Sequence, residues 1–383
     1  MRIVLAPDSF KGSLSAPQAC AALEAGLRRA LPQATILARP MADGGEGTLD
    51  AILHAAGPDG TRLRLTVHGA SGAATAAAYG RVDGGSTGVI EIAQVVGITD
   101  AVAMDAPVFA RSTFGVGEIM RALLDAGVRD LRVGLGGSST NDGGAGVLAA
   151  LGVRLLDASG GNVEPTPRGL PALAAIDVAG LDRRLASTRI TILSDVDNPL
   201  TGPLGATAVF GPQKGVLAED VEAIDAALAR YASLAERAFG RAVARRPGAG
   251  SAGGLGFALQ LLGAEANSGA EVVADLVGLD AALAGADWVL TGEGRSDRQT
   301  LHAKAPFVVA RRARAAGVPV TLLAGAVDPS SLGALGGHFA GCFALVPGPA
   351  SLEQCMAEAP AWLADRAEQV ARVFAAARGA HAG

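Results

Sequence analysis

A glycine-rich loop is the first place where this sequence could do chemistry. Residues 134–146 read GLGGSSTNDGGAG and continue an apolar stretch that begins at Leu131. Closely spaced glycines let backbone N–H groups approach an anion, and a helix that starts there adds the partial positive charge of its N-terminus. We therefore predict a cradle for phosphate or carboxylate, in which Asn141 also caps the helix. The cradle residues are Gly136, Gly137, Ser138, Ser139, Asn141 and Asp142.

This loop differs from two common nucleotide-binding patterns. It lacks the G-x-x-x-x-G-K-[ST] pattern of a Walker A loop, and no lysine lies nearby. It also lacks the G-x-G-x-x-G register of a dinucleotide fold. An anion bound here would therefore be held in another way.

A pair of carboxylates marks the end of a second predicted strand, 189–195. The segment 195–203 reads DVDNPLTGP and places Asp195 and Asp197 two residues apart. One carboxylate would accept the proton of a substrate hydroxyl and the other would help to hold Mg²⁺, as phosphoryl transfer requires. An Asx turn at 197–199 is the structural alternative. The spacing alone does not decide between the two.

Charged residues of both signs follow another predicted strand, 286–292. The segment reads TGEGRSDRQT from Thr291 to Thr300. Its charged side chains, Glu293, Arg295 and Asp297, would either serve Mg²⁺ and phosphate or form a solvated ion-pair loop.

Lysine is rare in this chain. Of 32 basic residues only three are lysines, namely Lys11, Lys214 and Lys304, and each lies in a short segment between predicted elements. A compact ammonium is a common phosphate partner, so these positions are predicted anion contacts. The five histidines are scattered and suggest no metal site or triad. His302, beside Lys304, is interpreted as a helix-cap residue.

Repeated strand–loop–helix units must position these loops. Capping boxes are predicted at Ser15 with Gln18 and at Ser268 with Glu271. Residues 62–93 are predicted to form short strands joined as hairpins, without the alternation of strands and helices seen elsewhere in the chain. Five parallel-type strands are predicted, at 2–7, 35–41, 286–292, 318–325 and 341–348.

Five alternating strands predict an α/β fold of the flavodoxin-like kind, a parallel five-stranded three-layer domain interrupted by a second mixed α/β domain. The first domain would comprise residues 1–61 and 285–383, and the inserted domain residues 62–284. Ligands of such sheets bind beyond the carboxyl ends of the strands. The loops expected there begin at Asp8 and Ser9, at Asp43, Gly44 and Glu46, and at Glu293.

Composition excludes several functional classes. A chain of 383 residues is long enough for two domains. A net charge of −5 with only 4% aromatic residues argues against a nucleic-acid partner. We find no apolar run of membrane length and no secretory signal, and the three cysteines are far apart. These features predict a cytoplasmic protein that binds no membrane.

Taken together, several segments resemble those of the bacterial type I glycerate kinases, the glycerate 2-kinase family. The resemblance runs over essentially the whole chain, and its specificity comes from the combination and order of the motifs. The segments are LAPDSFKGSLSA at 5–16, MADGGEGT at 41–48, RVGLGGSSTNDGGAG at 132–146, SDVDNPLTGPLGA at 194–206, VFGPQKG at 209–215, GSAGGLGFAL at 250–259, TGEGRSD at 291–297 and AKAP at 303–306.

The resemblance implies an enzyme that uses ATP and Mg²⁺ to phosphorylate D-glycerate, usually on the 2-hydroxyl, to give 2-phosphoglycerate. It also implies the interrupted flavodoxin-like fold, with Mg-ATP held by glycine-rich loops and lysines between the two domains, in a monomer or homodimer. We expect Asp195 to be the general base, with Lys11 and Asp297 as further catalytic residues. Asp197 and Glu293 are the expected Mg²⁺ ligands. Expected contacts of substrate or phosphate are Asp8, Ser9, Asp43, Gly44, Glu46, Gly136, Gly137, Ser138, Ser139, Asn141, Asp142, Lys214, Glu293, Arg295 and Lys304.

Two other functions stay open at this point. The stretch GLGGSS at 134–139 partly matches the glycine–serine motif of the galactokinase–homoserine kinase superfamily, whose fold would not place residues 2–7 and 286–292 in one parallel sheet. A non-catalytic binder of small carboxylates is the other alternative.

Overall fold

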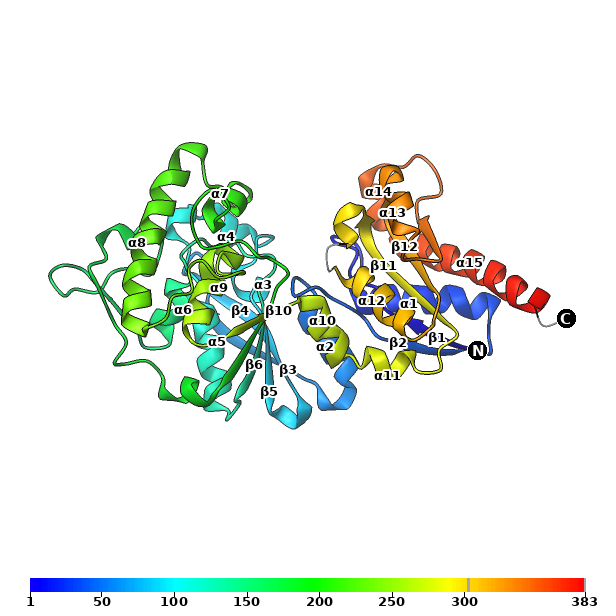
Figure 1. Ribbon diagram of the computed structural model, residues 1–383, viewed down its shortest axis with the longest axis horizontal. Coiled ribbons are helices and arrows are strands. Elements are labelled where there is room, and N and C mark those ends of the chain that lie inside the picture. Colours follow the sequence, from blue (N-terminus) through cyan, green and yellow to red (C-terminus); the bar gives the residue numbers. More distant parts are fainter. Residues whose placement is uncertain (302–303, 382–383) are drawn as a thin grey trace. The chain divides into compact units, whose positions relative to one another are not determined.

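The computed structural model describes residues 1–301 and 304–381, so His302 lies outside the described residues. The chain forms two compact units, shown in Figure 1. The first comprises Met1–Asp43, Asp50–Gly57 and Ala270–Gly383, and the second comprises Gly44–Leu49 and Pro58–Gly269. Within the described ranges, no helix is both long and apolar enough to cross a bilayer.

The first unit contains the predicted five-stranded parallel sheet, in the order β13-β12-β11-β1-β2. Its strands are β1 (Arg2–Leu5), β2 (Thr35–Ala38), β11 (Trp288–Ser296), β12 (Val320–Val327) and β13 (Gly341–Ala344). β1 pairs in parallel with β11. This pairing confirms the flavodoxin-like prediction and contradicts the galactokinase–homoserine kinase alternative.

Helices cover this sheet. α1 (Ala16–Ala30) and α15 (Ala359–His381) pack against one another and form a core with Ile3, Leu290 and Trp288. Val4 and Val289 alternate with these core residues and are also buried, while α12 (Ala305–Ala315) contacts β11 and β12. The remaining helices of this unit are α2 (Thr48–Ala56), which begins in the second unit, and α10 (Gly269–Leu276), α11 (Leu279–Leu283), α13 (Leu332–Leu335) and α14 (Leu352–Ala357).

Two local predictions about this unit have different outcomes. The capping box at the start of α1 is confirmed, because the Ser15 side chain accepts from the N–H of Gln18 and the Gln18 side chain accepts from the N–H of Ser15. The prediction that the β11 strand ends at residue 292 is wrong. The parallel ladder continues to the pair Ser296 and Val327.

The second unit is built on a mixed six-stranded sheet in the order β10-β9-β6-β5-β4-β3. The predicted hairpins are the antiparallel strands β3 (Thr61–His68), β4 (Ala74–Val82) and β5 (Thr87–Glu91). The parallel part comprises β6 (Asp130–Gly134), β9 (Arg189–Leu193) and β10 (Glu265–Asn267). A separate antiparallel pair is formed by β7 (Arg154–Leu156) and β8 (Ala175–Asp177).

Two apolar clusters stabilise this unit. One contains Ile90, Val133 and Ile192 from the sheet, and the other contains Leu228, Tyr231 and Phe257 from α8 and α9. The helices of the unit are α3 (Ala93–Val96), α4 (Ala101–Asp105), α5 (Phe114–Asp125), α6 (Ala145–Ala150), α7 (Ala206–Phe210), α8 (Val221–Phe239) and α9 (Ser251–Leu261).

Candidate active site in two groups of residues

In the first unit, a group of carboxylates gathers at the carboxyl-end edge of the sheet, after β1 and β2 and within the second half of β11. The N–H of Asp8 donates to the carbonyl oxygen of Gly292 at 2.8 Å, which joins the loop after β1 to β11. The N–H of Met41 donates to the carbonyl oxygen of Pro7 at 2.8 Å, which joins it to the loop that leads to Asp43. The topology therefore brings Asp8, Asp43 and Glu293 to one edge of the sheet.

The charges of these three carboxylates affect one another. Burial raises the pKa of Asp8 well above its usual value, and the nearby carboxylates of Asp43 and Glu293 raise it further. The N–H of Ser9, which donates to Asp8 Oδ1 at 2.6 Å, and the ammonium of Lys11 oppose this increase. The ionised form of Asp8 is therefore unfavourable until a cation approaches.

Glu293 is held in place by hydroxyl groups and by a lysine. Its Oε1 accepts from Ser296 Oγ at 2.9 Å and from Thr300 Oγ1 at 2.6 Å, and its Oε2 lies 3.8 Å from Lys304 Nζ. Burial raises the pKa of Glu293, although Thr300, Lys304 and Ser296 oppose this effect. Thus Lys304 contacts a carboxylate of the group.

Three other predicted site residues of this unit lie nearer to solvent. Lys11 is exposed, and the Arg295 side chain is 74% exposed, with its Nε 4.0 Å from Asp297 Oδ2. Asp297 Oδ1 accepts from the N–H of Gln299 at 2.8 Å, at the start of a short 3₁₀ turn. Asp297 therefore stabilises its own loop, whereas Lys11 and Arg295 are accessible to an anion.

In the second unit, the polar side chains of the glycine-rich loop are buried. Ser138 is 5% exposed, and Ser139, Thr140, Asn141 and Asp142 are fully buried. Asn141 does not cap α6, so that prediction is wrong. Its Nδ2 donates instead to Thr207 Oγ1 at 3.0 Å.

Asp142 binds the N–H groups that Asn141 was expected to satisfy. Its Oδ1 accepts from the N–H of Gly144 at 3.1 Å, and its Oδ2 accepts from the N–H of Gly146 at 3.2 Å. Oδ2 also accepts from the N–H and the hydroxyl of Thr113, both at 2.8 Å. Burial raises the pKa of Asp142, and these four donors oppose that effect. The carboxylate therefore fixes the conformation at the start of α6.

Two buried cations hold the same loop. Lys214 Nζ donates to Ser138 Oγ and to the carbonyl oxygen of Thr140, both at 2.8 Å. Arg111 Nη1 donates to the carbonyl oxygens of Ser139 at 3.0 Å and of Lys214 at 2.8 Å. Burial lowers the pKa of Lys214 to about 7; the Asp142 carboxylate opposes this effect and Arg111 adds to it. Lys214 thus braces the loop from within the protein.

The density of glycine in this loop has a structural cause. The N–H of Gly136 donates to the carbonyl oxygen of Gly44 at 3.1 Å, and a Cβ at Gly136 would collide with the backbone of Gly45. On the other side, Gly253 has a φ of +67°, and a Cβ there would collide with the carbonyl oxygen of Thr140. Three glycine-rich segments therefore pack backbone against backbone, and Gly44 and Gly136, both predicted site residues, are brought together.

The pair Asp195 and Asp197 lies beside this loop. β9 ends at Leu193, before the aspartates, and the N–H of Leu135 donates to the Leu193 carbonyl oxygen at 3.2 Å. Both aspartates are exposed, and Asp195 Oδ1 accepts from the N–H of Gly269 at 3.2 Å. The loops after β6 and β9 thus leave the same edge of the second unit's sheet.

Two further predicted residues, Glu46 and Gly137, belong to the glycine-rich segments of the second unit. Glu46 is exposed, and Gly137 has a φ of +73° beside the isolated bridge that links Gly97 with Ser138. Among the described residues, no three His, Cys, Asp or Glu side chains form a set that could hold a metal ion by themselves. Arg111 and Thr113 had no signal in the sequence, because the residues that link them to this site, Ser139, Lys214 and Asp142, lie 28 to 103 residues away.

Comparison with known proteins gives a consistent result. Residues 3–375 match the model of the glycerate kinase family. The chain is 42% identical to a glycerate kinase of Bacillus subtilis (strain 168) over 97% of both chains, and 40% identical to a glycerate 2-kinase of Escherichia coli (strain K12) over 85% of this chain and 86% of that one. The crystal structure of a Salmonella typhimurium LT2 protein, provisionally named glycerate kinase 2, superposes with a TM-score of 0.87 at 40% identity and covers 99% of each chain.

Proposed function

The chain belongs to the glycerate kinase family and is a phosphotransferase that acts on glycerate, and from this premise we propose that it transfers the γ-phosphoryl group of ATP to the 2-hydroxyl of D-glycerate. The observation that carries the proposal is the group of Asp8, Asp43 and Glu293 at a sheet edge that also bears Lys11 and Lys304. A kinase must bring together two anionic substrates, and it does so mainly through positioned cations. The lysines and a carboxylate-bound cation meet this need.

The carboxylate group suits Mg²⁺. Kinases hold this ion through one or two carboxylates together with the substrate phosphates. Burial and the neighbouring carboxylates of Asp43 and Glu293 raise the pKa of Asp8, and a bound cation would favour its ionised form. Asp8 and Asp43 are therefore the residues that would hold the ion, with Glu293 beside them. When bound, Mg²⁺ neutralises negative charge on the phosphates. Asp197 stays a prediction as a second contact for the ion.

Asp195 is proposed as the general base. Its carboxylate is exposed next to the glycine-rich loop, and the N–H of Gly269 orients one of its oxygens. In this role Asp195 accepts the proton of the glycerate hydroxyl as the oxygen attacks the γ-phosphorus. The loop after β6, braced by Lys214 and Arg111, presents a fixed backbone to the carboxylate of glycerate.

The test is an assay of ADP release with D-glycerate, L-glycerate and Mg-ATP. We expect turnover with D-glycerate and a fall in kcat of ~10²–10⁴ for Asp195→Asn, with an unchanged KM for Mg-ATP. The neighbouring variant Asp197→Asn serves as the comparison and should instead raise the Mg²⁺ concentration needed for half-maximal rate. A loss below tenfold for Asp195→Asn would assign the base to another residue.

A further inference from the structure

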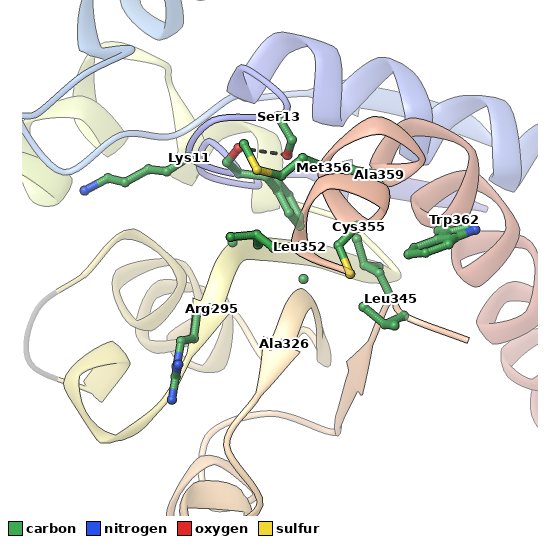
Figure 2. A pocket seen from close by; sticks show the side chains of 14 residues that line it. Lys11, Ser13, Arg295, Ala326, Leu345, Leu352, Cys355, Met356, Ala359 and Trp362 are labelled. Atoms are coloured by element: carbon green, nitrogen blue, oxygen red, sulfur yellow. Dashed lines mark hydrogen bonds between the residues drawn. The ribbon is translucent and has the colours of Figure 1, made fainter. Parts of the chain in front are cut away.

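The first unit carries a pocket of about 270 Å³ at the carboxyl-end edge of its sheet, lined by the last residues of β11 and β12 and by the residues just after β13. Its apolar lining includes Phe10, Leu345, Met356 and Trp362. Figure 2 shows Lys11 and Arg295 on one side of this pocket, with their charged ends directed away from its apolar residues, and Leu345 and Trp362 on the opposite side. The pocket therefore has an apolar end and a cationic end.

Glycines let the strands and loops around the pocket pack closely against one another. Gly294 and Gly325 face each other on neighbouring strands, and a Cβ at Gly325 would collide with the carbonyl oxygen of Gly294. Gly12 has a φ of +79°, and a Cβ there would come within 2.5 Å of the methyl group of Met356. The absence of side chains at these positions lets Met356 lie over the loop after β1.

The size and the lining favour one part of a larger ligand. Pockets that enclose a drug-sized molecule usually measure ~300–1,000 Å³, so this pocket would hold one flat group and leave the rest outside. Trp362 and Met356 offer an indole ring and a polarisable sulfur, which suit an aromatic guest. Glycerate has neither an aromatic nor an apolar portion, so this lining does not suit it.

The cationic end identifies the rest of the ligand. Gly294 and Arg295, which line the pocket, directly follow Glu293 on β11, so the pocket adjoins the carboxylate group described above. A molecule with a flat apolar end in the pocket and its charged end at Lys11 and Arg295 must carry negative charge. ATP has this arrangement, with a purine at one end and phosphates at the other.

We propose that this pocket receives the adenine base of ATP and that Lys11 and Arg295 contact its phosphates. The proposal rests on the kinase activity proposed above and names the nucleotide subsite within it. Ligands of open α/β sheets bind at the edge where the strands have their carboxyl ends, and the pocket lies at that edge.

The chain carries its own reporter for this test. Of its two tryptophans, Trp362 lines the pocket, whereas Trp288 is 1% exposed and stacks on Phe374. In the Trp288→Phe variant all tryptophan emission comes from Trp362. ADP and adenosine should each change this emission saturably, and inorganic tripolyphosphate should leave it unchanged because it has no base.

A second variant fills the pocket. Ala326 lines it and is exposed, so Ala326→Phe should fold normally and occupy the space of the base. We expect its KM for ATP to rise at least ~tenfold, equal to ~1.4 kcal/mol, with kcat and the KM for glycerate within about threefold of the parent values. The matched control is Ala334→Phe, at an exposed alanine of α13 that does not line this pocket; its kinetics should not change.

The outcomes separate this proposal from the proposed function. An unchanged KM for ATP in Ala326→Phe would overturn the adenine site and leave the proposed kinase activity unaffected. The same holds if the parent enzyme turns over but the emission of Trp362 does not change when ADP is added. Absence of glycerate-dependent ADP release in the parent protein would overturn the proposed function. In that case, binding of ADP and adenosine at Trp362 would still support a nucleotide site.

Discussion

The replacement Lys214→Met tests how the buried cation of the second unit is stabilised. Lys214 is 2% exposed, and its ammonium has two oxygen acceptors at 2.8 Å, Ser138 Oγ and the carbonyl oxygen of Thr140. Burial nevertheless lowers its pKa to about 7 from 10.5 in the unfolded chain. Methionine has a similar length and no charge, so it removes the titration and keeps much of the volume.

The magnitude follows from proton linkage. Between pH 7 and 10.5 the unfolded chain binds a proton that the folded protein has lost, so the free energy of unfolding rises with pH in this range and is independent of this group at lower pH. Each pH unit contributes up to ~1.36 kcal/mol. Because half of the folded molecules are still protonated near pH 7, we expect a gain of roughly 2 kcal/mol between pH 7 and pH 9.

The two units have separate spectroscopic probes. Both tyrosines, Tyr79 and Tyr231, belong to the second unit, and both tryptophans, Trp288 and Trp362, belong to the first. Urea unfolding followed by second-derivative tyrosine absorbance therefore reports the unit that contains Lys214. We expect Lys214→Met to reduce the gain in unfolding free energy between pH 7 and pH 9 by roughly 2 kcal/mol.

A matched variant controls for general effects of removing a lysine. Lys304 lies in the first unit, where its side chain is 32% exposed, so Lys304→Met should leave the pH dependence of the tyrosine transition unchanged. If Lys214→Met keeps the full gain between pH 7 and pH 9, then Lys214 stays charged throughout this range. The two oxygen acceptors would then outweigh burial, and the reasoning would be refuted.

Two further replacements test the two groups of the candidate active site. Asp8→Asn should raise the urea midpoint of the tryptophan transition at pH 8 and have little effect at pH 4. Because the pKa of Asp8 is higher in the folded protein than in the unfolded chain, the fold loses stability as the pH rises above the unfolded value of 3.8, and the loss is complete above the raised pKa. ADP release should fall at least ~tenfold. An unchanged midpoint at pH 8 would show that the carboxylate is not destabilising. Gly136→Ala should lower the free energy of unfolding reported by tyrosine by ~1–3 kcal/mol, because its Cβ meets the backbone of Gly45. Gly333→Ala, where a Cβ meets nothing within 4 Å, is its control and is followed by the tryptophan transition because Gly333 belongs to the first unit. Equal losses of unfolding free energy in the two variants would refute the packing explanation.

The architecture of the first unit was predictable because its signals are local. Each parallel strand is a short apolar run followed by a turn and a helix, and Ser15 and Gln18 begin α1 as their spacing predicts. The same pattern at Ser268 and Glu271 was misleading. Glu271 forms ion pairs with Arg311 and Arg312, and Ser268 Oγ is buried without a hydrogen-bond partner. A local pattern is therefore overridden when a distant cation competes for the carboxylate.

The candidate site was less predictable because its contacts are long-range. The rarity of lysine drew attention to Lys214 as an anion contact, which stays a prediction. It gave no sign that Lys214 is buried, since its partners Ser138 and Thr140 are 76 and 74 residues away. The glycine-rich loop predicted a close backbone approach, and the structure shows that the approaching groups include the protein's own backbone at Gly45. A high glycine content does not tell whether a ligand or another segment of the chain approaches the loop, because either one needs loop positions without side chains.

The most direct measurement is the proton-coupled phosphorus NMR spectrum of the product formed from D-glycerate and Mg-ATP. Phosphate on the 2-hydroxyl couples to the single hydrogen of that carbon and gives a doublet, which is the result we predict. A triplet would place the phosphate on the 3-hydroxyl and contradict the proposed position. A spectrum that contains only ATP, ADP and inorganic phosphate would contradict phosphoryl transfer to D-glycerate altogether.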